Sequence, residues 1–219
     1  MSDRKENTPE QQPVKVLLLA LDMGRYDMER SMDELSALAE ANNMEAVAQI
    51  VQKRDAPEAG TVLGVGKLEE AKLYAMNLGA EAAIFDGELT GSQIRNLSEF
   101  LEIEVLDRTM LILEIFRSRA TTNEGKLQTE LAMQRYRLPR LQGLGQSLSR
   151  QGGGGGGTAG ARRGSGESQL ELDRRHVHHR IEALEAKLKE MEKRRGENRR
   201  ARQKSGVPVV ALVGYTNVG

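Results

Sequence analysis

Strand-like and helix-like segments alternate along residues 14–119, and this alternation constrains the fold more than any other feature of the chain. Residues 14–21 are almost wholly apolar, residues 27–42 carry apolar side chains at helical spacing, and residues 44–51 are strand-like again. After a break at 55–60, the pattern continues with an apolar segment at 61–63, helices at 68–78, 92–101 and 109–119, and strands at 82–85 and 103–106. Strands that alternate with helices of this length predict an α/β fold with a helix-flanked, mainly parallel sheet.

Ligands of such sheets bind at the carboxyl ends of strands, so residues at those positions are candidates for a site. Gly64 and Gly66 open a helix, but a dinucleotide fingerprint requires a third glycine where Glu69 stands, so they predict only a tight turn. Asp86 and Asp107 each follow a strand and precede a helix, where turn and N-cap roles are the default for aspartate. Because no catalytic or metal-ligating set can be assembled from these residues, the sequence predicts a binding or docking platform.

The pattern changes after residue 120 to two long helical stretches, at 124–144 and 167–203, with no strand between them. Each stretch carries apolar residues along one side: Leu127, Leu131, Leu138 and Leu141 in the first, and Leu170, Val177, Ile181, Leu184, Leu188 and Met191 in the second. Pro139 is expected to kink or end the first helix. Because each narrow apolar seam is best buried against the other, the sequence predicts a long antiparallel α-helical hairpin, coiled-coil-like, that projects as an arm.

Six consecutive glycines, at 152–157, separate the two stretches and leave no side chain that could form a core there. Composition alone favours a flexible linker. Dense glycine also lets a backbone follow a surface closely, and the flanking arginines, with no acidic residue over 149–166, suit phosphate contacts. The residues predicted to contact RNA are Arg150, Gly152, Gly153, Gly154, Arg162, Arg163, Arg174, Arg175, Arg199 and Arg200.

The formal net charge of the chain is zero, but its two halves differ in sign. Residues 1–116 carry 11 Lys and Arg against 22 Asp and Glu, whereas residues 117–219 carry 21 against 10, which gives −11 and +11. A basic half attracts phosphate backbones whatever their base sequence. A pair of well-solvated helices has the same composition, so charge alone leaves both interpretations open.

Composition excludes several classes of protein. The chain has no cysteine, so disulfides, thiolate metal sites and cysteine nucleophiles are excluded, and a reducing, cytoplasmic location is expected. Its longest apolar runs fall far short of the roughly 20 residues of a membrane-spanning helix, and its N-terminal residues are polar. His176 and His179 share a helix face with no further ligand nearby, so no metal site is expected.

The last residues of the chain combine an apolar strand, at 209–213, with a glycine-bounded turn. Gly214, Tyr215, Thr216, Asn217, Val218 and Gly219 occupy the first six positions of the phosphate-binding pattern G-x-x-x-x-G-K-[ST]. The Lys and the Ser/Thr that would contact the phosphates and Mg²⁺ are absent. We therefore expect these six residues to form part of a nucleotide site, and the chain itself to be inactive; a terminal strand that ends in a glycine turn is the alternative.

Ten segments, in order and spacing, carry a resemblance that covers nearly all of residues 14–219. They are 64–70 (GVGKLEE), 85–86 (FD), 106–109 (LDRT), 112–116 (ILEIF), 124–128 (EGKLQ), 130–132 (ELA), 138–141 (LPRL), 164–171 (GSGESQLE), 173–175 (DRR) and 213–217 (VGYTN). The sequence resembles the HflX family of ribosome-associated GTPases, within the Obg-HflX group. Ser165 and Ser168 stand where the family has Pro and Thr, and Val218 stands where Ala is usual.

The resemblance implies a GTPase that uses GTP and Mg²⁺ in its full-length form, binds the large ribosomal subunit and splits or rescues stalled ribosomes. It also implies that the arm and its glycine loop reach ribosomal RNA near the peptidyl transferase centre. The protein is expected to be a monomer. Its expected organisation is a disordered tail at 1–13, an α/β subdomain at 14–119, a helical arm at 120–205 with a tip loop at 149–166, and the first strand of a truncated P-loop GTPase domain at 206–219. The alternatives are a stand-alone RNA-binding adaptor without nucleotide chemistry and a small-molecule enzyme built on the front sheet.

Overall fold

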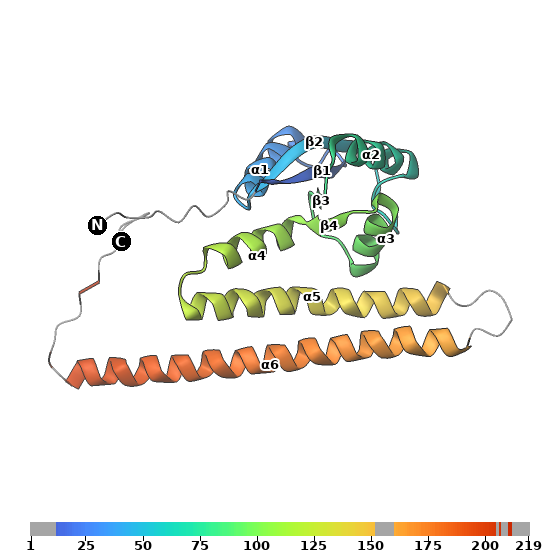
Figure 1. Cartoon of the computed structure of the whole chain (residues 1–219). Coiled ribbons are helices and arrows are strands. Elements are labelled where there is room, and N and C mark those ends of the chain that lie inside the picture. Colours follow the sequence, from blue (N-terminus) through green and yellow to red (C-terminus); the bar gives the residue numbers. More distant parts are fainter. Residues whose placement is uncertain (1–11, 152–159, 205, 207–209, 212–219) are drawn as a thin grey trace, which may run out of the picture.

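The computed structural model describes residues 12–151, 160–204, 206 and 210–211 (Figure 1), with side chains described over 12–141, 171–204, 206 and 210–211. In chain order the elements are β1 Val14–Asp22, α1 Met28–Glu40, β2 Met44–Lys53, α2 Val65–Leu78, β3 Ala82–Phe85, α3 Gly91–Leu101, β4 Glu104–Asp107, α4 Arg108–Arg119, α5 Asn123–Gln151 and α6 Gly160–Lys204. The strands and helices predicted over residues 14–119 are confirmed, apart from the segment at 61–63.

The four strands form one parallel sheet in the order β2-β1-β3-β4. Strand β1 pairs with β2 from Val14 opposite Met44 to Asp22 opposite Lys53, and it pairs with β3 on its other side. A strand covered by helices on both faces can be apolar along its whole length, which explains the sequence of β1. The predicted parallel, helix-flanked sheet is confirmed, and β2 and β4 are its two edges.

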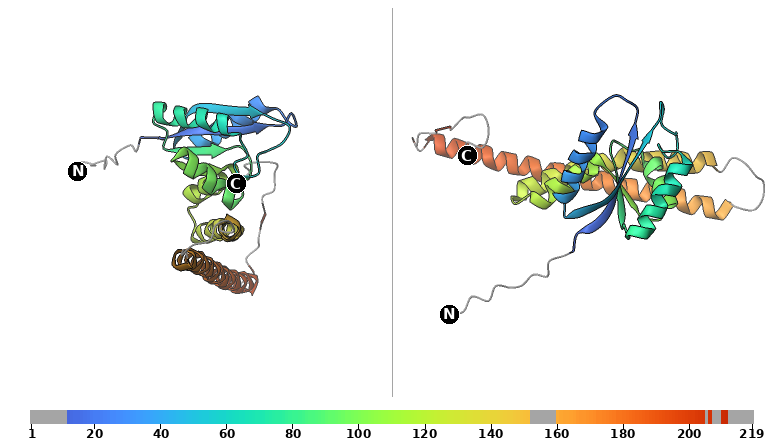
Figure 2. Two further views of the ribbon diagram at one scale, coloured as in Figure 1. Left: turned by 90° about the vertical axis from the view of Figure 1, so that its right-hand side faces the viewer. Right: turned by 90° about the horizontal axis from the view of Figure 1, so that it is seen from above.

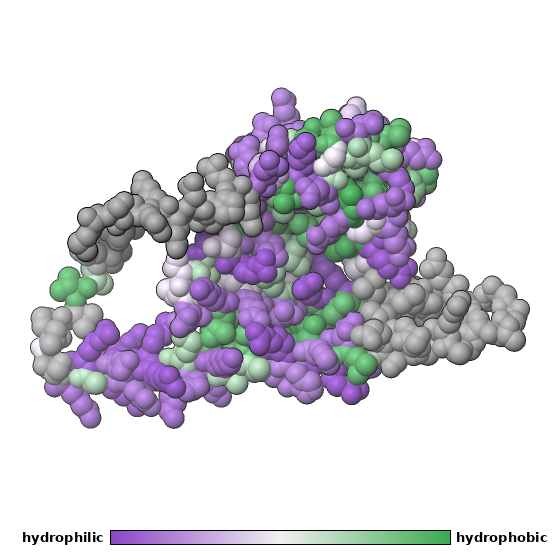
Figure 3. Space-filling view, in the orientation of Figure 1, coloured by the Kyte–Doolittle hydropathy of each residue, from purple (hydrophilic) through white to green (hydrophobic). Residues whose placement is uncertain are grey.

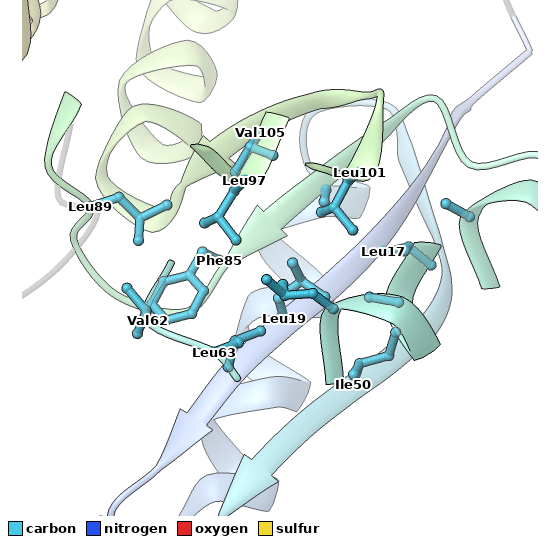
Figure 4. Packing of buried hydrophobic residues seen from close by; sticks show 14 of the residues in the cluster. Leu17, Leu19, Ile50, Val62, Leu63, Phe85, Leu89, Leu97, Leu101 and Val105 are labelled. Carbon is cyan, nitrogen blue, oxygen red and sulfur yellow. The ribbon is translucent and has the colours of Figure 1, made fainter. Parts of the chain in front are cut away.

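Side chains of β1 alternate between two cores, one on each face of the sheet. Leu17 and Leu19 pack against α2 and α3 (Figure 4), whereas Val16 and Leu18 pack against α1 and α4. All four side chains are fully buried. Burial of one such side chain stabilises a fold by about 1.5–3 kcal/mol, so β1 contributes to both cores at once.

Residues 61–63 belong to a tight turn and not to a strand. Val62 has a φ of 63°, and its backbone pairs with Glu58 in an isolated antiparallel bridge. A positive φ is rare for a β-branched residue. The turn is held by the amide of Asn96, which donates to the carbonyl oxygen of Gly60, and by burial of Val62 in the core between the sheet and α2. The apolar character of this segment therefore reflects a buried loop.

Both long helices extend further than the sequence predicts. Helix α5 reaches Gln151 and α6 begins at Gly160, so the predicted tip loop at 149–166 is wrong at both ends. Each residue added to an existing helix gains a hydrogen bond, and this propagation carries both helices into glycine-containing sequence. Pro139 lies inside α5 and does not end it.

Helix α5 lies between the α/β unit and α6, and the two long helices run side by side in opposite directions (Figures 1 and 2). At 1.5 Å per residue, the 45 residues of α6 span about 68 Å. In the described part of the chain, no helix has both the length and the apolar character that a membrane crossing requires.

Candidate nucleic-acid interface

The two long helices are joined by a short apolar seam. Leu131 of α5 packs against Ile181 and Leu184 of α6, and Leu184 is fully buried. Partly buried side chains extend the seam on both helices: Leu127, Leu138, Val177 and Leu188. These are residues that the helical spacing of the sequence assigns to the seam, because an amphipathic helix buries its apolar stripe.

Charged pairs on either side of the seam fix how the helices are aligned. Arg180 of α6 pairs with Glu130, Arg135 of α5 pairs with Glu185 at 2.7 Å, and Arg195 pairs with Glu124. Glu124, near the start of α5, pairs with Arg195, whereas Arg135, further along α5, pairs with Glu185, which precedes Arg195 in α6; this order is that of antiparallel helices. Because these pairs are exposed, each contributes only about 0–1 kcal/mol to the free energy of unfolding. Their main effect is therefore to select one alignment of the two helices.

Helix α6 also carries exposed cations that take no part in this pairing. Arg175, Arg199 and Arg200 are exposed, and within the described residues no ion pair or hydrogen bond engages their side chains. Lys189 and Lys193 are also exposed, and within the described residues their side chains form no ion pair or hydrogen bond. On the face of the molecule in view in Figure 3, hydrophilic residues predominate along α6. Exposed cations without acidic partners are available to bind phosphate groups.

The other residues predicted to contact RNA are placed less completely. Arg174 is half-buried and lies 3.4 Å from Glu171, so part of its charge is already balanced. Arg150 falls in the last turn of α5, and Arg162 and Arg163 fall in the first turn of α6, but their side chains are not described. The predicted glycine contacts Gly152, Gly153 and Gly154 lie outside the described residues, as do all six residues of the predicted phosphate loop, 214–219.

A buried carboxylate, that of Asp107, attaches α5 to the α/β unit. Its Oδ1 accepts a hydrogen bond from the backbone N–H of Met110, which makes Asp107 the N-cap of α4 as its position in the sequence predicts. Its Oδ2 accepts hydrogen bonds from the Tyr136 hydroxyl at 2.6 Å and from Arg140 Nη2 at 3.0 Å, both on α5. Oδ2 also accepts from the backbone N–H of Leu89.

Two further features tighten this attachment. The guanidinium carbon of Arg140 lies 3.4 Å from the centroid of the Tyr136 ring, in a cation–π contact. Gly91, the first residue of α3, is so close to α5 that a Cβ atom there would lie 2.0 Å from the carbonyl oxygen of Arg140. Burial and the hydrogen bond to Asp107 raise the pKa of Tyr136 above its ordinary value of 10.0, so its hydroxyl stays a donor. We refer to Asp107, Tyr136 and Arg140 as the α5 anchor.

The second buried carboxylate, Asp86, forms side-chain contacts that the sequence does not predict. It does not cap a helix; its Oδ2 accepts from the Ser31 hydroxyl at 2.6 Å and its Oδ1 from Arg108 Nη1 at 2.7 Å. Arg108 also pairs with Glu34 of α1 at 2.7 Å. Burial opposes the charge on Arg108, but the hydrogen bonds to Asp86 and Glu34 outweigh it and raise its pKa. The side chain of Asp86 therefore joins β3 to α1 and α4, while its backbone lies in a tight turn in which the N–H of Gly87 donates to the carbonyl oxygen of Phe85.

The remaining candidates from the sequence have structural roles. Gly64 is the N-cap of α2, and its N–H donates to the Gln52 side chain at 2.8 Å, consistent with a tight entry into the helix. Gly66 lies within that helix facing open space. Over the described residues, no group of three or more His, Cys, Asp or Glu side chains could hold a metal ion, and His179 lies 3.5 Å from Glu182.

Sequence reasoning on single residues missed the α5 anchor, because its members are 29 and 33 residues from Asp107. One signal was nevertheless present. Asp107 and Arg140 both fall in segments that carry the family resemblance, LDRT at 106–109 and LPRL at 138–141.

Comparison with known families assigns both parts of the molecule to one class of protein. Residues 29–117 match the family described as GTP-binding GTPase N-terminal, and residues 119–202 match the one described as GTP-binding GTPase Middle Region. The α/β unit and the paired helices thus correspond to the N-terminal and middle regions of GTP-binding GTPases.

Curated relatives make the assignment more specific. The chain is 47% identical over 205 residues to GTPase HflX of Caldanaerobacter subterraneus subsp. tengcongensis, covering 94% of this chain and 46% of that protein. It is 43% identical over 193 residues to GTPase HflX of Escherichia coli, covering 88% and 44%. The chain belongs to the HflX family, and it spans about half the length of the curated relatives it matches.

Solved structures show the same fold. The structure described as an SsGBP and GDP complex superposes with a TM-score of 0.61 at 22% identity, covering 84% of this chain and 46% of that one. A GTP-binding protein from Sulfolobus solfataricus in complex with GDP superposes with a TM-score of 0.56 at 22% identity, covering 82% and 46%. At this level of identity the likeness concerns the fold alone.

Proposed function

We propose that this chain provides the ribosome-binding region of an HflX GTPase, and that α6 faces the ribosomal RNA of the large subunit. The observation that carries the proposal is the set of exposed cations on α6, led by Arg175, Arg199 and Arg200, that no acidic side chain balances within the described residues. A long helix supported along one side by α5 can present such charges to a folded RNA at fixed spacing.

In the longer protein, residues 214–219 would begin the phosphate loop of a GTPase domain that uses GTP and Mg²⁺ to split or rescue stalled ribosomes in the cytoplasm. The family membership and the pattern of residues 209–219 support this part of the proposal. The backbone N–H groups of such a loop hold phosphates, while the Lys and Ser/Thr of the full pattern supply charge and a Mg²⁺ ligand. The 219-residue chain alone is therefore expected not to bind labelled GTP at micromolar concentration.

The experiment measures binding of the chain to purified large ribosomal subunits over a series of salt concentrations. Each phosphate contact should add about 0.7–0.9 to the slope of log K against log salt. The double variant Arg199→Gln with Arg200→Gln should weaken binding and lower the slope. The matched control, Arg25→Gln with Lys53→Gln, removes two exposed charges from the α/β unit and should change neither.

Three outcomes would count against the proposal. Binding that is independent of salt would show that phosphates are not the main contact. An equal loss in the α6 variant and in the control would show that net charge, and not the surface of α6, determines binding. Micromolar GTP binding by the 219-residue chain would contradict the part that concerns the nucleotide.

A further inference from the structure

Helix α2 is apolar on two sides. One side, with Leu68, Ala71 and Ala75, is buried against the sheet. The other side is exposed, and it carries five of the nine exposed large hydrophobic side chains in the described part of the chain: Val65, Leu73, Tyr74, Met76 and Leu78. In Figure 3, hydrophobic residues gather over this helix at the upper right. A helix that is apolar around its circumference is usually buried, so this side of α2 is expected to have a partner.

The exposed side of α2 has the shape of a helix-packing ridge. Val65, Glu69 and Leu73 are spaced four residues apart, and Met76, which is 72% exposed, extends the row by almost one turn. Rows of this spacing pack into the groove of a second helix. Gly66 lies beside the row, and a Cβ atom there would have no neighbour within 4 Å, so a side chain of the partner has room. The backbone groups of α2 are paired within the helix, so an added strand would find no hydrogen bonds here.

The charge of this surface is negative. Among the exposed residues of α2 only Glu69 is charged, and within the described residues it forms no ion pair. Lys67 and Lys72 are half-buried and already form ion pairs with glutamates. The α/β unit as a whole carries 11 Lys and Arg against 19 Asp and Glu, which gives −8. Such a surface repels an RNA backbone or an anionic membrane and attracts a basic segment of protein.

The position of α2 in the molecule limits which polypeptide can cover it. In Figures 1 and 2, α2 lies on the far side of the α/β unit from the Lys204 end of α6, so chain that continues from Lys204 starts at the opposite end of the molecule. A second copy would pack the same surface against itself and bring two Glu69 side chains and two acidic units together, which is unfavourable. The surface therefore fits a separate, basic polypeptide.

We propose that the exposed side of α2 binds an amphipathic helix of another protein, with an apolar side and basic residues along its flanks. The apolar side chains of this helix pack on Val65, Leu73 and Met76, and one of its lysines or arginines pairs with Glu69. An interface between two single helices is small, so binding should be weak and reversible, with a dissociation constant of about 10–500 μM. The surface is separate from α6, and the proposal does not depend on the function proposed above.

The test uses three synthetic peptides of about 15 residues as probes. The first has leucine at i, i+3, i+4 and i+7 and lysine at most other positions. The second has the same composition with the leucines spread around the helix, and the third has glutamate in place of lysine. In NMR of the 219-residue chain with methyl-labelled methionine, the Met76 signal should shift and saturate with the first peptide. The second and third should bind at least about tenfold more weakly. The signal of Met32, buried on the other face of the sheet, should stay in place.

Two variants with matched controls locate the surface. Leu73→Gln removes apolar area beside Met76 and should weaken binding of the first peptide at least about tenfold. Leu172→Gln, the same change at an exposed position of α6, should leave binding unchanged. Glu69→Lys should also weaken binding at least about tenfold, whereas Glu40→Lys, at an exposed position of α1, should change it less than about twofold. Circular dichroism melting curves check that each variant is folded.

Four results would overturn the proposal. If the Met76 signal does not saturate with the first peptide, α2 is not a binding surface. If Leu73→Gln binds that peptide as tightly as the unchanged chain does, the peptide binds elsewhere. If the second or third peptide binds as tightly as the first, the surface selects no basic amphipathic helix. If sedimentation equilibrium shows a dimer that Leu73→Gln converts to a monomer, the partner of α2 is a second copy.

Discussion

The carboxylate of Asp107 accepts four hydrogen bonds, two from backbone N–H groups of the α/β unit and two from side chains of α5. It is fully buried, and Arg140 is its only charged partner within the described residues. A buried charge pair is poor evidence of net stabilisation, but removal of one partner leaves the other charge buried without compensation. At the scale of single residues, the attachment of the arm depends on this one acceptor.

The variant Asp107→Ala should lower the free energy of unfolding by about 3 kcal/mol, since Arg140 and Tyr136 lose their shared acceptor. Urea unfolding measures this value. Glu104→Gln, on the same strand but exposed, should change it by less than about 0.5 kcal/mol. Similar values for the two variants would show that the α5 anchor contributes little.

Tyr136 gives the anchor a dependence on alkaline pH. Burial and the hydrogen bond to Asp107 raise the pKa of Tyr136 in the folded chain above 10.0. The folded state thus holds this proton more tightly than the unfolded state, so the stabilisation is complete below about pH 10 and is lost as pH rises through the folded-state pKa. The difference in unfolding free energy between the unchanged chain and Tyr136→Phe should therefore shrink above about pH 10. A difference that is constant up to about pH 11 would contradict this.

How far the sequence predicts these roles depends on the distance of each contact along the chain. The N-cap role of Asp107 is predicted, because a cap involves residues three positions apart. The hydrogen bonds from α5 to Asp107 are not predicted, because nothing in the local sequence pattern specifies which helix packs at the end of β4. The side-chain partners of Asp86 are not predicted for the same reason, since they lie 55 and 22 residues away.

At the scale of elements, periodicity predicts the strands and helices of residues 14–119 because each is amphipathic or buried in a regular way. It fails at Val62, where tertiary contacts hold an apolar residue in a turn. It also fails at the ends of α5 and α6, where glycine and proline suggest termination but the helices continue. Low intrinsic propensity is overcome there by propagation from a strong helix.

The pairing of the long helices depends on few apolar contacts, so a single truncation should loosen it. Leu184→Ala removes a fully buried side chain from the seam and should cost about 2–5 kcal/mol locally. Hydrogen exchange should accelerate in α6 and remain slow in β1, which has separate cores. Leu172→Ala, at an exposed position of the same helix, is the matched control. Equal acceleration in β1 would show that the whole chain unfolds as one unit.

At the scale of the whole molecule, the charges are divided between two bodies, with acidic residues in the first half of the chain and basic residues in the second. RNA should therefore contact the chain on one side only. The acetylation rates of Lys189 and Lys193, both exposed on α6, should fall severalfold when ribosomal RNA is bound. The rate of Lys53, exposed at the end of β2, should not change. Equal protection of all three would indicate binding without orientation.

The α5 anchor lies much closer to one end of the paired helices than to the other. Arg140 lies eleven residues, or about 16 Å, from the end of α5 at Gln151. The cross-helix pairs place Arg140 opposite residues near 170–180 of α6, so Lys204 lies about 44 Å from the anchor in the other direction. A rotation of about 5° at the anchor would displace the Lys204 end by about 4 Å and the Gln151 end by less than half of that. A small rotation at the edge of the sheet would therefore produce its largest displacement at the Lys204 end of α6, from which the chain continues.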